Sequence, residues 1–256
     1  VFLEHSIVDS VAWPRKMKIL SPLNFLFSLI SLKATELYKN TVHYWPFEEV
    51  SNRSVIDYTG YNDGRLRGSF NIISGIVGAA LEISGNSSWV DFGVLPSLCI
   101  NHPETCRSGF TIALWLKIQG FQNNRIILQL GQHRFSRGLT IWTQRSLRKN
   151  IGFSTNTLNR KYYWMLEWKN DNWNHIALKW DNRAGSLRIY FNCTLAKVVN
   201  KSKKATPLED NKPSRLTLGA SHAKKNHMKL MVDEFAIWNH TVSDDLLCKV
   251  FRIHSG

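Results

Sequence analysis

Residues 173–192 read WNHIALKWDNRAGSLRIYFN, and this stretch predicts the fold better than any other part of the chain. Its first half alternates, so that Ile176 and Trp180 fall on the same face of an extended strand. Residues 181–185 (DNRAG) are turn formers, after which the alternation resumes as far as Phe191. Alternation on both sides of such a turn is typical of an antiparallel hairpin with one buried face. Because that face carries tryptophan, it needs a second sheet to pack against.

Short segments of the same kind recur with polar turns between them, which favours a two-sheet antiparallel sandwich. We expect strands over residues 41–48, 78–84, 88–93, 109–118, 125–131, 138–143, 150–155, 162–168, 173–180, 186–192, 194–199, 214–219 and 228–238. Residues 241–251 predict a short helix at the C-terminal end of the chain. Ser243 can cap this helix, and two aspartates fall in its first turn, where the helix dipole favours acids.

The sequence of these segments resembles the laminin G-like branch of the concanavalin A-like jelly rolls. The hairpin follows the family pattern W-x-H-[IV]-A-x-x-[WY]-[DN] and then L-x-[IV]-Y-x-[ND]-G, with Cys193 in place of the last glycine. Other segments that resemble family motifs are HYWPF at 43–47, DYTGYNDG at 57–64, GAALEISG at 78–85, GFTIALWLK at 109–117 and VDEFAIW at 232–238. The resemblance covers residues 43–251. It implies an all-β, two-sheet antiparallel jelly-roll sandwich with a short C-terminal helix.

The N-terminal part of the chain predicts a targeting segment. The first residue is Val, and Met17 begins a short basic start followed by an apolar run to Leu32. This pattern is typical of a secretory signal peptide, because the apolar run is too short and interrupted for a membrane span. We therefore expect residues 1–16 to be non-native upstream sequence, 17–34 a signal peptide and 35–256 the jelly-roll domain. An uncleaved signal anchor is the alternative, and no other stretch can span a bilayer.

Cysteine usage agrees with a secreted, extracellular protein, because the four cysteines form an even set. Cys99 and Cys106 enclose a short loop, where a local bridge would fasten the loop to a sheet edge. A second bridge would then join Cys193 to Cys248. Four cysteines permit three connectivities, of which we prefer this one. Free thiols in a cytosolic protein are the alternative.

Five N-x-[ST] sequons also favour secretion. They begin at Asn52, Asn86, Asn192, Asn200 and Asn239. Each glycan would need an exposed loop or edge position. Asn192 is the doubtful sequon, because Cys193 follows it and a disulfide there would hinder modification.

The formal charge of +14 directs attention to acidic partners. Basic residues gather in three loops, around residues 201–212, 145–149 and 224–225. The candidate polyanion-binding residues are Lys201, Lys203, Lys204, Arg145, Arg148 and Lys149. Sulfated polysaccharide such as heparan sulfate, which laminin G-like domains bind, is the natural polyanion outside the cell. The alternative is three solvated loops that never meet on one face. The signal peptide and the sequons argue against nucleic acid as a partner.

The resemblance also implies a calcium site, since domains of this type often hold Ca²⁺ between the 57–64 loop and a strand near the C-terminus. Calcium prefers about six to eight oxygen ligands. Matched position by position, Asp57 and Asp233 would supply carboxylates, and Asn62 and Gly64 would supply carbonyl or side-chain oxygens. The alternative is structural: Asp57 makes an Asx turn, and Asp233 binds the backbone of the loop.

The sequence does not indicate catalysis. Glucanases of this superfamily carry E-x-D-x-x-E on one strand, which places two carboxylates on the same face, and this chain has no such string. Its acids mostly stand side by side, so they would point to opposite faces of a strand. We expect a secreted, non-catalytic binding or adhesion module for glycans or glycoproteins. The alternatives are a glycoside-active enzyme of the same fold and a purely structural matrix domain.

A group of aromatic residues lies outside the motifs that most clearly build the core. Its members are Trp142, Tyr162, Tyr163, Trp164 and Trp168. Rings of this kind can stack on a sugar face, but they can equally cover the second sheet. We favour the second interpretation for the group.

Overall fold

The structure of the protein is a computed structural model. It describes residues 38, 40–95, 99–130, 138–158, 160–169, 171–200, 203–204 and 215–254, all of which belong to the unit Leu37–Gly256. The expected upstream segment and signal peptide, residues 1–16 and 17–34, lie outside the described residues. None of the described helices is both long enough and apolar enough to cross a membrane.

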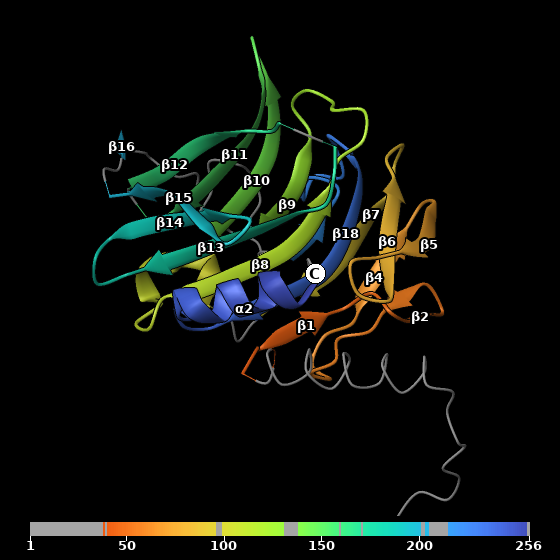
Figure 1. Cartoon of the computed structure of the whole chain (residues 1–256), viewed down its shortest axis with the longest axis horizontal. Helices are drawn as coiled ribbons and strands as arrows, with labels where there is room; N and C mark the ends of the chain where they lie inside the picture. The colour runs from red at the N-terminus through yellow and green to blue at the C-terminus, as the bar shows by residue number, and fades with distance from the viewer. Residues whose placement is uncertain are drawn as a thin grey trace, which may run out of the picture. The chain divides into compact units, whose positions relative to one another are not determined.

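Two antiparallel sheets form the fold (Figure 1), which confirms the predicted jelly-roll sandwich. The eight-stranded sheet has the order β15 (Thr194–Val199), β14 (Ser186–Phe191), β13 (Asn174–Asp181), β8 (Phe110–Lys117), β18 (Lys229–Trp238), β6 (Ala79–Ser84) and β5 (Phe70–Ser74), with β1 (His43–Trp45) pairing β18. The ten-stranded sheet has the order β16 (Lys203–Lys204), β12 (Arg160–Glu167), β11 (Lys149–Asn156), β10 (Gly138–Arg145), β9 (Ile126–Leu130), β17 (Arg215–Leu218), β7 (Trp89–Val94), β4 (Gly64–Arg67), β3 (Ser54–Val55) and β2 (Val50–Ser51). The helical elements are η1 (Cys99–Asn101), η2 (Pro103–Thr105) and α2 (Asp244–His254).

The predicted hairpin is the β13–β14 pair. Its register places Trp180 opposite Leu187 and Leu178 opposite Ile189, and all four side chains lie in the core between the sheets. The Trp180 indole also donates a hydrogen bond to the Pro103 carbonyl oxygen (2.9 Å). Burying a large apolar side chain stabilises a fold by about 1.5–3 kcal/mol. The side chains of the β13–β14 hairpin therefore contribute substantially to the stability of the core.

The hairpin differs from the prediction on its other face, which is also buried. There Ala177 and Tyr190 belong to a second apolar cluster that includes Leu247 and Val250 of α2. Helix α2 therefore covers the outer face of the eight-stranded sheet. The Ser243 side chain accepts the Leu246 N–H (3.1 Å), as expected of an N-cap.

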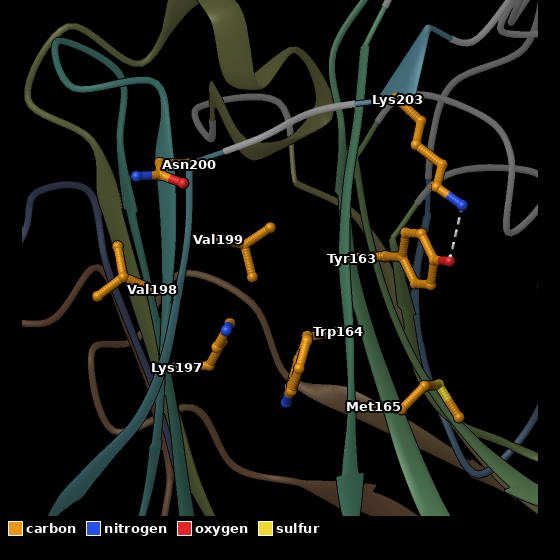
Figure 2. Close-up of a pocket in the computed structure, with 8 residues that line it drawn as sticks. All are labelled: Tyr163, Trp164, Met165, Lys197, Val198, Val199, Asn200 and Lys203. Atoms are coloured by element: carbon orange, nitrogen blue, oxygen red, sulfur yellow. Dashed lines mark hydrogen bonds between the residues drawn. The ribbon is translucent and has the colours of Figure 1, made fainter.

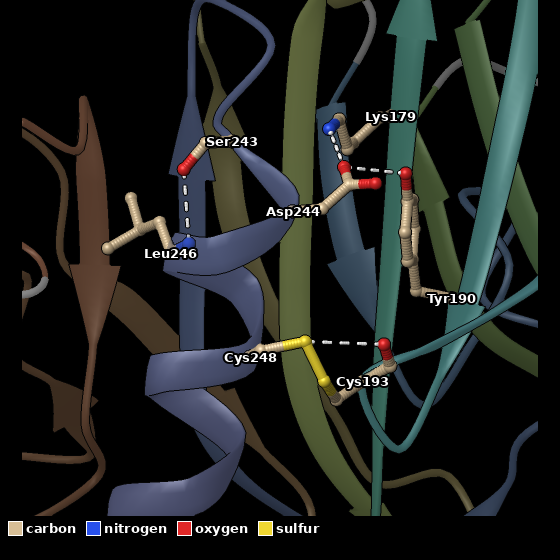
Figure 3. The surroundings of a disulfide bond; sticks show 7 residues. All are labelled: Lys179, Tyr190, Cys193, Ser243, Asp244, Leu246 and Cys248. Carbon is tan, nitrogen blue, oxygen red and sulfur yellow. Dashed lines mark hydrogen bonds and ion pairs between the residues drawn. A yellow bond between two sulfur atoms is a disulfide. The ribbon is translucent and has the colours of Figure 1, made fainter.

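Helix α2 is fastened to the sheet by a polar cluster and a disulfide (Figure 3). Asp244 accepts hydrogen bonds from the Lys179 ammonium (2.5 Å) and the Tyr190 hydroxyl (2.8 Å). One turn further along the helix, Cys248 is bonded to Cys193, which follows β14. Cys193 has φ of 67°, a left-handed conformation that suits glycine, and this explains why the family pattern has glycine there.

The second disulfide joins Cys99 and Cys106 across η1 and η2. The structure therefore contains the connectivity preferred from the sequence, and the described residues include no free cysteine. Each expected strand is present with ends within three residues of the prediction. Five short strands were not predicted, namely β2, β3, β4, β5 and β16.

Candidate functional site

The two sheets meet along one side of the sandwich, where β12 approaches β15. A pocket of about 600 Å³ lies there, which we call the β12–β15 groove (Figure 2). Its lining residues are Tyr163, Trp164, Met165, Lys197, Val198, Val199, Asn200 and Lys203. The groove exists because strand pairing stops early: β16 pairs with β12 only at Arg160 and Lys161. Within the described residues, the rest of that edge of β12 has no strand beside it.

Trp164 is the central side chain of the groove. It is 38% exposed, and it extends from β12 into the space between the two strands (Figure 2). The Lys197 ammonium, on β15, lies 4.3 Å from the centre of its ring. This distance is within the range of a cation–π interaction, which holds the lysine beside the ring without covering all of it.

Tyr163 lies beside Trp164 but points to the other face of β12, because neighbouring strand residues alternate. Its hydroxyl lies 3.1 Å from the Lys203 ammonium, and that ammonium is 5.0 Å from the ring centre. Lys161 approaches the same ring at 5.2 Å. Three lysines from β12, β15 and β16 thus surround two partly exposed aromatic rings.

The predicted aromatic group divides in two. Trp142, Tyr162 and Trp168 are buried, as the preferred interpretation expected. Tyr162 packs 4.8 Å from Trp180 in the core, and the Trp142 ring fills the space over Gly152, where a Cβ atom would come within 2.3 Å of it. Trp164 and Tyr163, by contrast, are open to solvent or half-buried.

The predicted polyanion-binding residues also divide. Lys203 and Lys204 lie beside the first residues of β12, whereas Arg145, Arg148 and Lys149 lie at the β10–β11 hairpin, next to the last residues of β12. The eight residues of β12 separate these places by about 23 Å along the strand. The two basic regions therefore lie at opposite ends of β12. Lys201 lies outside the described residues.

Asp57, one of the predicted calcium ligands, is the centre of a hydrogen-bond network. Its Oδ2 atom accepts from His43 Nδ1 (2.7 Å) and the Asn62 N–H (3.1 Å), and its Oδ1 atom accepts from the Tyr44 N–H (3.0 Å). Burial would raise the pKa of Asp57, but the hydrogen bonds from His43, Tyr44 and Thr59 outweigh it and lower this pKa.

Asp233 and Glu234 lie on a β-bulge in β18, where Glu234 has φ of 53°. Asp233 accepts the N–H groups of Ile76 (2.7 Å) and Val77 (3.2 Å), while Glu234 accepts the Tyr44 hydroxyl (2.8 Å). Burial raises the pKa of Asp233 well above its usual value, and it raises the pKa of Glu234 to about 7. Burial therefore favours the protonated form of both carboxyl groups relative to the same groups in water.

Protein hydrogen bonds account for only part of the oxygen set predicted to bind calcium, because Asp233 Oδ1 has no hydrogen-bond partner among the described residues. Both oxygens of Asp57 accept from protein donors, as does Asp233 Oδ2, and the Asn62 side-chain amide donates to the Phe92 carbonyl oxygen. Gly64 lies in β4, where a Cβ atom would clash with Phe92. Among the described residues, no three His, Cys, Asp or Glu side chains are grouped to hold a metal ion. Calcium binding stays a prediction.

The sequons occupy different environments. Asn52, Asn86, Asn200 and Asn239 are exposed. Asn192 is half-buried, and its carboxamide accepts the His175 N–H (2.8 Å) and donates to the Asn174 side chain (3.1 Å). A glycan on Asn192 would disturb both contacts.

Three solved structures are similar to this chain in fold. The botulinum neurotoxin DC binding domain, solved in complex with rat synaptotagmin II and also with SialylT, gives a TM-score of 0.61 at 14% identity, covering 86% of this chain and 52% of that one. Domain 4 of an extracellular arabinanase from Geobacillus stearothermophilus, in complex with arabinotriose, gives 0.62 at 14% identity, covering 82% of this chain and 98% of that one. The chain thus spans about half the length of the neurotoxin domains.

No curated protein matches the chain in sequence. A laminin G family model, described as the concanavalin A-like lectin/glucanases superfamily, matches residues 84–248, which is more than half of the chain. This match includes the β13–β14 hairpin and the strands that form the β12–β15 groove. The chain belongs to the concanavalin A-like lectin/glucanases superfamily.

Proposed function

We propose that the protein is an extracellular, non-catalytic module that binds glycans, free or on glycoproteins, in the β12–β15 groove. The observation that carries the proposal is the 38% exposed Trp164 ring at the centre of a pocket of about 600 Å³. A pocket that combines an apolar floor with a few convergent polar groups is the usual form of a small-ligand site.

The groove has the chemistry that a sugar ring needs. The exposed face of Trp164 suits the C–H face of a pyranose, since exposed aromatic surface is stabilised when water leaves it. Lys197, beside the Trp164 ring, can donate to sugar hydroxyls or to an acidic substituent. Asn200 supplies both a donor and an acceptor at the rim.

The comparisons support a binding role in general terms. Sugar complexes are known for the arabinanase domain and for the neurotoxin domain, and the neurotoxin domain also has a protein complex. A glycosidase would need two carboxyl groups flanking the bond it cleaves. The described residues that line the groove include no such pair. The two disulfides fit an extracellular setting.

The test is a glycan array followed by titration of any bound glycan against three proteins. Trp164→Ala should weaken binding about tenfold, which corresponds to ~1.4 kcal/mol. Tyr61→Ala is the matched control, because Tyr61 is 82% exposed but lies in the 57–64 loop, away from the residues of the groove. Equal binding by wild type and Trp164→Ala would disprove the groove as the site. An array without any bound glycan would favour a purely structural domain.

A further inference from the structure

The β10–β11 hairpin ends in a tip, residues 145–149, that presents an apolar side chain to solvent. Figure 1 shows this green hairpin projecting at the top of the view. Arg145 lies opposite Lys149 in the β10–β11 strand register. The Ser146 N–H donates to the Arg148 carbonyl oxygen (3.2 Å), which closes a tight turn. Leu147, at the apex, is fully exposed, with 102% of its reference surface open.

Cations surround this leucine. Arg145, Arg148 and Lys149 are all exposed. Arg148 lies 2.9 Å from Glu167 and Lys149 lies 3.7 Å from Asp171, but these are exposed pairs, which contribute little and exchange readily for other anions. Arg145 makes no ion pair with any described residue. The tip therefore offers three cations to an external anionic surface.

A second basic loop belongs to the same end of the ten-stranded sheet. Lys224 and Lys225 are exposed in the turn between β17 and β18. The Ile126 N–H donates to the Asn226 carbonyl oxygen (3.0 Å), which ties this turn to the start of β9. Strand β9 pairs with β10 near its end, so the lysine turn and the hairpin tip share one end of the sheet.

We propose that this end of the protein docks on an anionic membrane surface, with Leu147 inserted at the boundary between headgroups and acyl chains. The five cations would contact lipid phosphates and carboxylates. Surface binding of this kind grows with buried apolar area and with attraction between basic residues and anionic lipid. The groove lies midway along the sheet rather than at its tip end, so docking would leave the groove accessible.

The exposed leucine is the reason to choose a membrane over a soluble polyanion. A sulfated polysaccharide needs only charge, and it offers no apolar layer in which Leu147 could leave water. A lipid surface offers both. Binding to the two kinds of partner should therefore respond differently when Leu147 alone is changed.

The experiment measures sedimentation of the whole protein with vesicles of phosphatidylcholine, alone or mixed with phosphatidylserine. We expect binding only to the mixed vesicles, weakened about tenfold by Leu147→Glu and by Arg145→Glu. Leu158→Glu is the matched control, because Leu158 is also exposed, at 52%, but lies in the turn at the opposite end of β11. It should bind like wild type.

Three outcomes would overturn the proposal. The first is no binding to mixed vesicles. The second is equal binding by wild type and Leu147→Glu while Arg145→Glu binds less, which indicates a charge-only polyanion surface. The third is equal loss in Leu147→Glu and Leu158→Glu, which indicates a general effect of added negative charge. Immobilised heparin provides the parallel arm, where Arg145→Glu should elute earlier, while Leu147→Glu should shift only as much as Leu158→Glu.

Discussion

The two disulfides should differ in how much they stabilise the protein. Removing the Cys193–Cys248 bond opens a loop of 55 residues, whereas removing Cys99–Cys106 opens one of only 7. The chain-entropy relation assigns about 4 kcal/mol to the longer loop and about 2.4 kcal/mol to the shorter one. The double variant C193A/C248A should therefore lose about 2 kcal/mol more free energy of unfolding than C99A/C106A.

Packing reduces the expected difference in stability between the two double variants. Cys106 is buried in the core and Cys99 packs against it, so alanine at these positions also leaves a small cavity. Cys193 and Cys248 are half-buried at the edge of α2 and leave less empty space. The expected difference shrinks accordingly to about 1–2 kcal/mol.

Urea titration of the two double variants and the oxidised wild type would measure the difference. For a domain of this size, 1 kcal/mol corresponds to roughly 2–4 °C in melting temperature, so heating gives a second reading. If C99A/C106A proved equally or less stable than C193A/C248A, the loop-entropy argument would be refuted.

Three further predictions concern the acidic cluster and the sequons. Burial raises the pKa of Glu234 from 4.5 to about 7, so the folded state holds this proton more tightly than the unfolded chain does. The protonated carboxyl group therefore contributes fully to the free energy of unfolding below about pH 4.5, and this contribution is lost as pH rises through about 7. Glu234→Gln should therefore flatten the fall in the urea midpoint between about pH 5 and pH 8; an unchanged slope would contradict this. Adding Ca²⁺ or EDTA should leave the melting temperature unchanged, because both oxygens of Asp57 and Oδ2 of Asp233 already accept protein hydrogen bonds. A rise of several degrees with Ca²⁺ would support the predicted calcium site, in which Asp233 Oδ1 is the oxygen without a hydrogen-bond partner among the described residues. Glycopeptide mass spectrometry of secreted protein should find Asn192 unmodified, since its side-chain amide is hydrogen-bonded to His175 and Asn174. An occupied Asn192 would contradict this and show that the glycan is attached before these contacts form.

Local patterns were sufficient to predict the long strands and the terminal helix. In β13 and β14 the alternation extends over many residues, and one face carries Trp180 and Ile189, so the signal is strong. The short strands lack such a signal. β2 and β3 have two residues each, and the turn between them uses Asn52 and Arg53, both with positive φ, instead of the Asn-Gly pair that marks a hairpin.

The groove was not predictable because it depends on strand order. The sequence around Trp164 reads as a strand, but only the sheet arrangement reveals that β12 lies near an edge and faces β15. Lys197 reaches Trp164 from another sheet, and Lys203 reaches Tyr163 from 40 residues away. Likewise, the sequence does not reveal which hydrogen-bond donors surround Asp57 and Asp233, because these donors come from other segments of the chain.

The left-handed backbone at Cys193 has a consequence for how this disulfide can be lost in evolution. A non-glycine residue in that conformation costs about 1–3 kcal/mol unless its surroundings hold it. Mutation of Cys248 first would remove the bond and leave the strained backbone at Cys193 in place. Mutation of Cys193 to glycine first removes the bond but relieves the backbone. Descendants of this sequence should therefore more readily carry a lone cysteine in the helix than a lone cysteine in the turn.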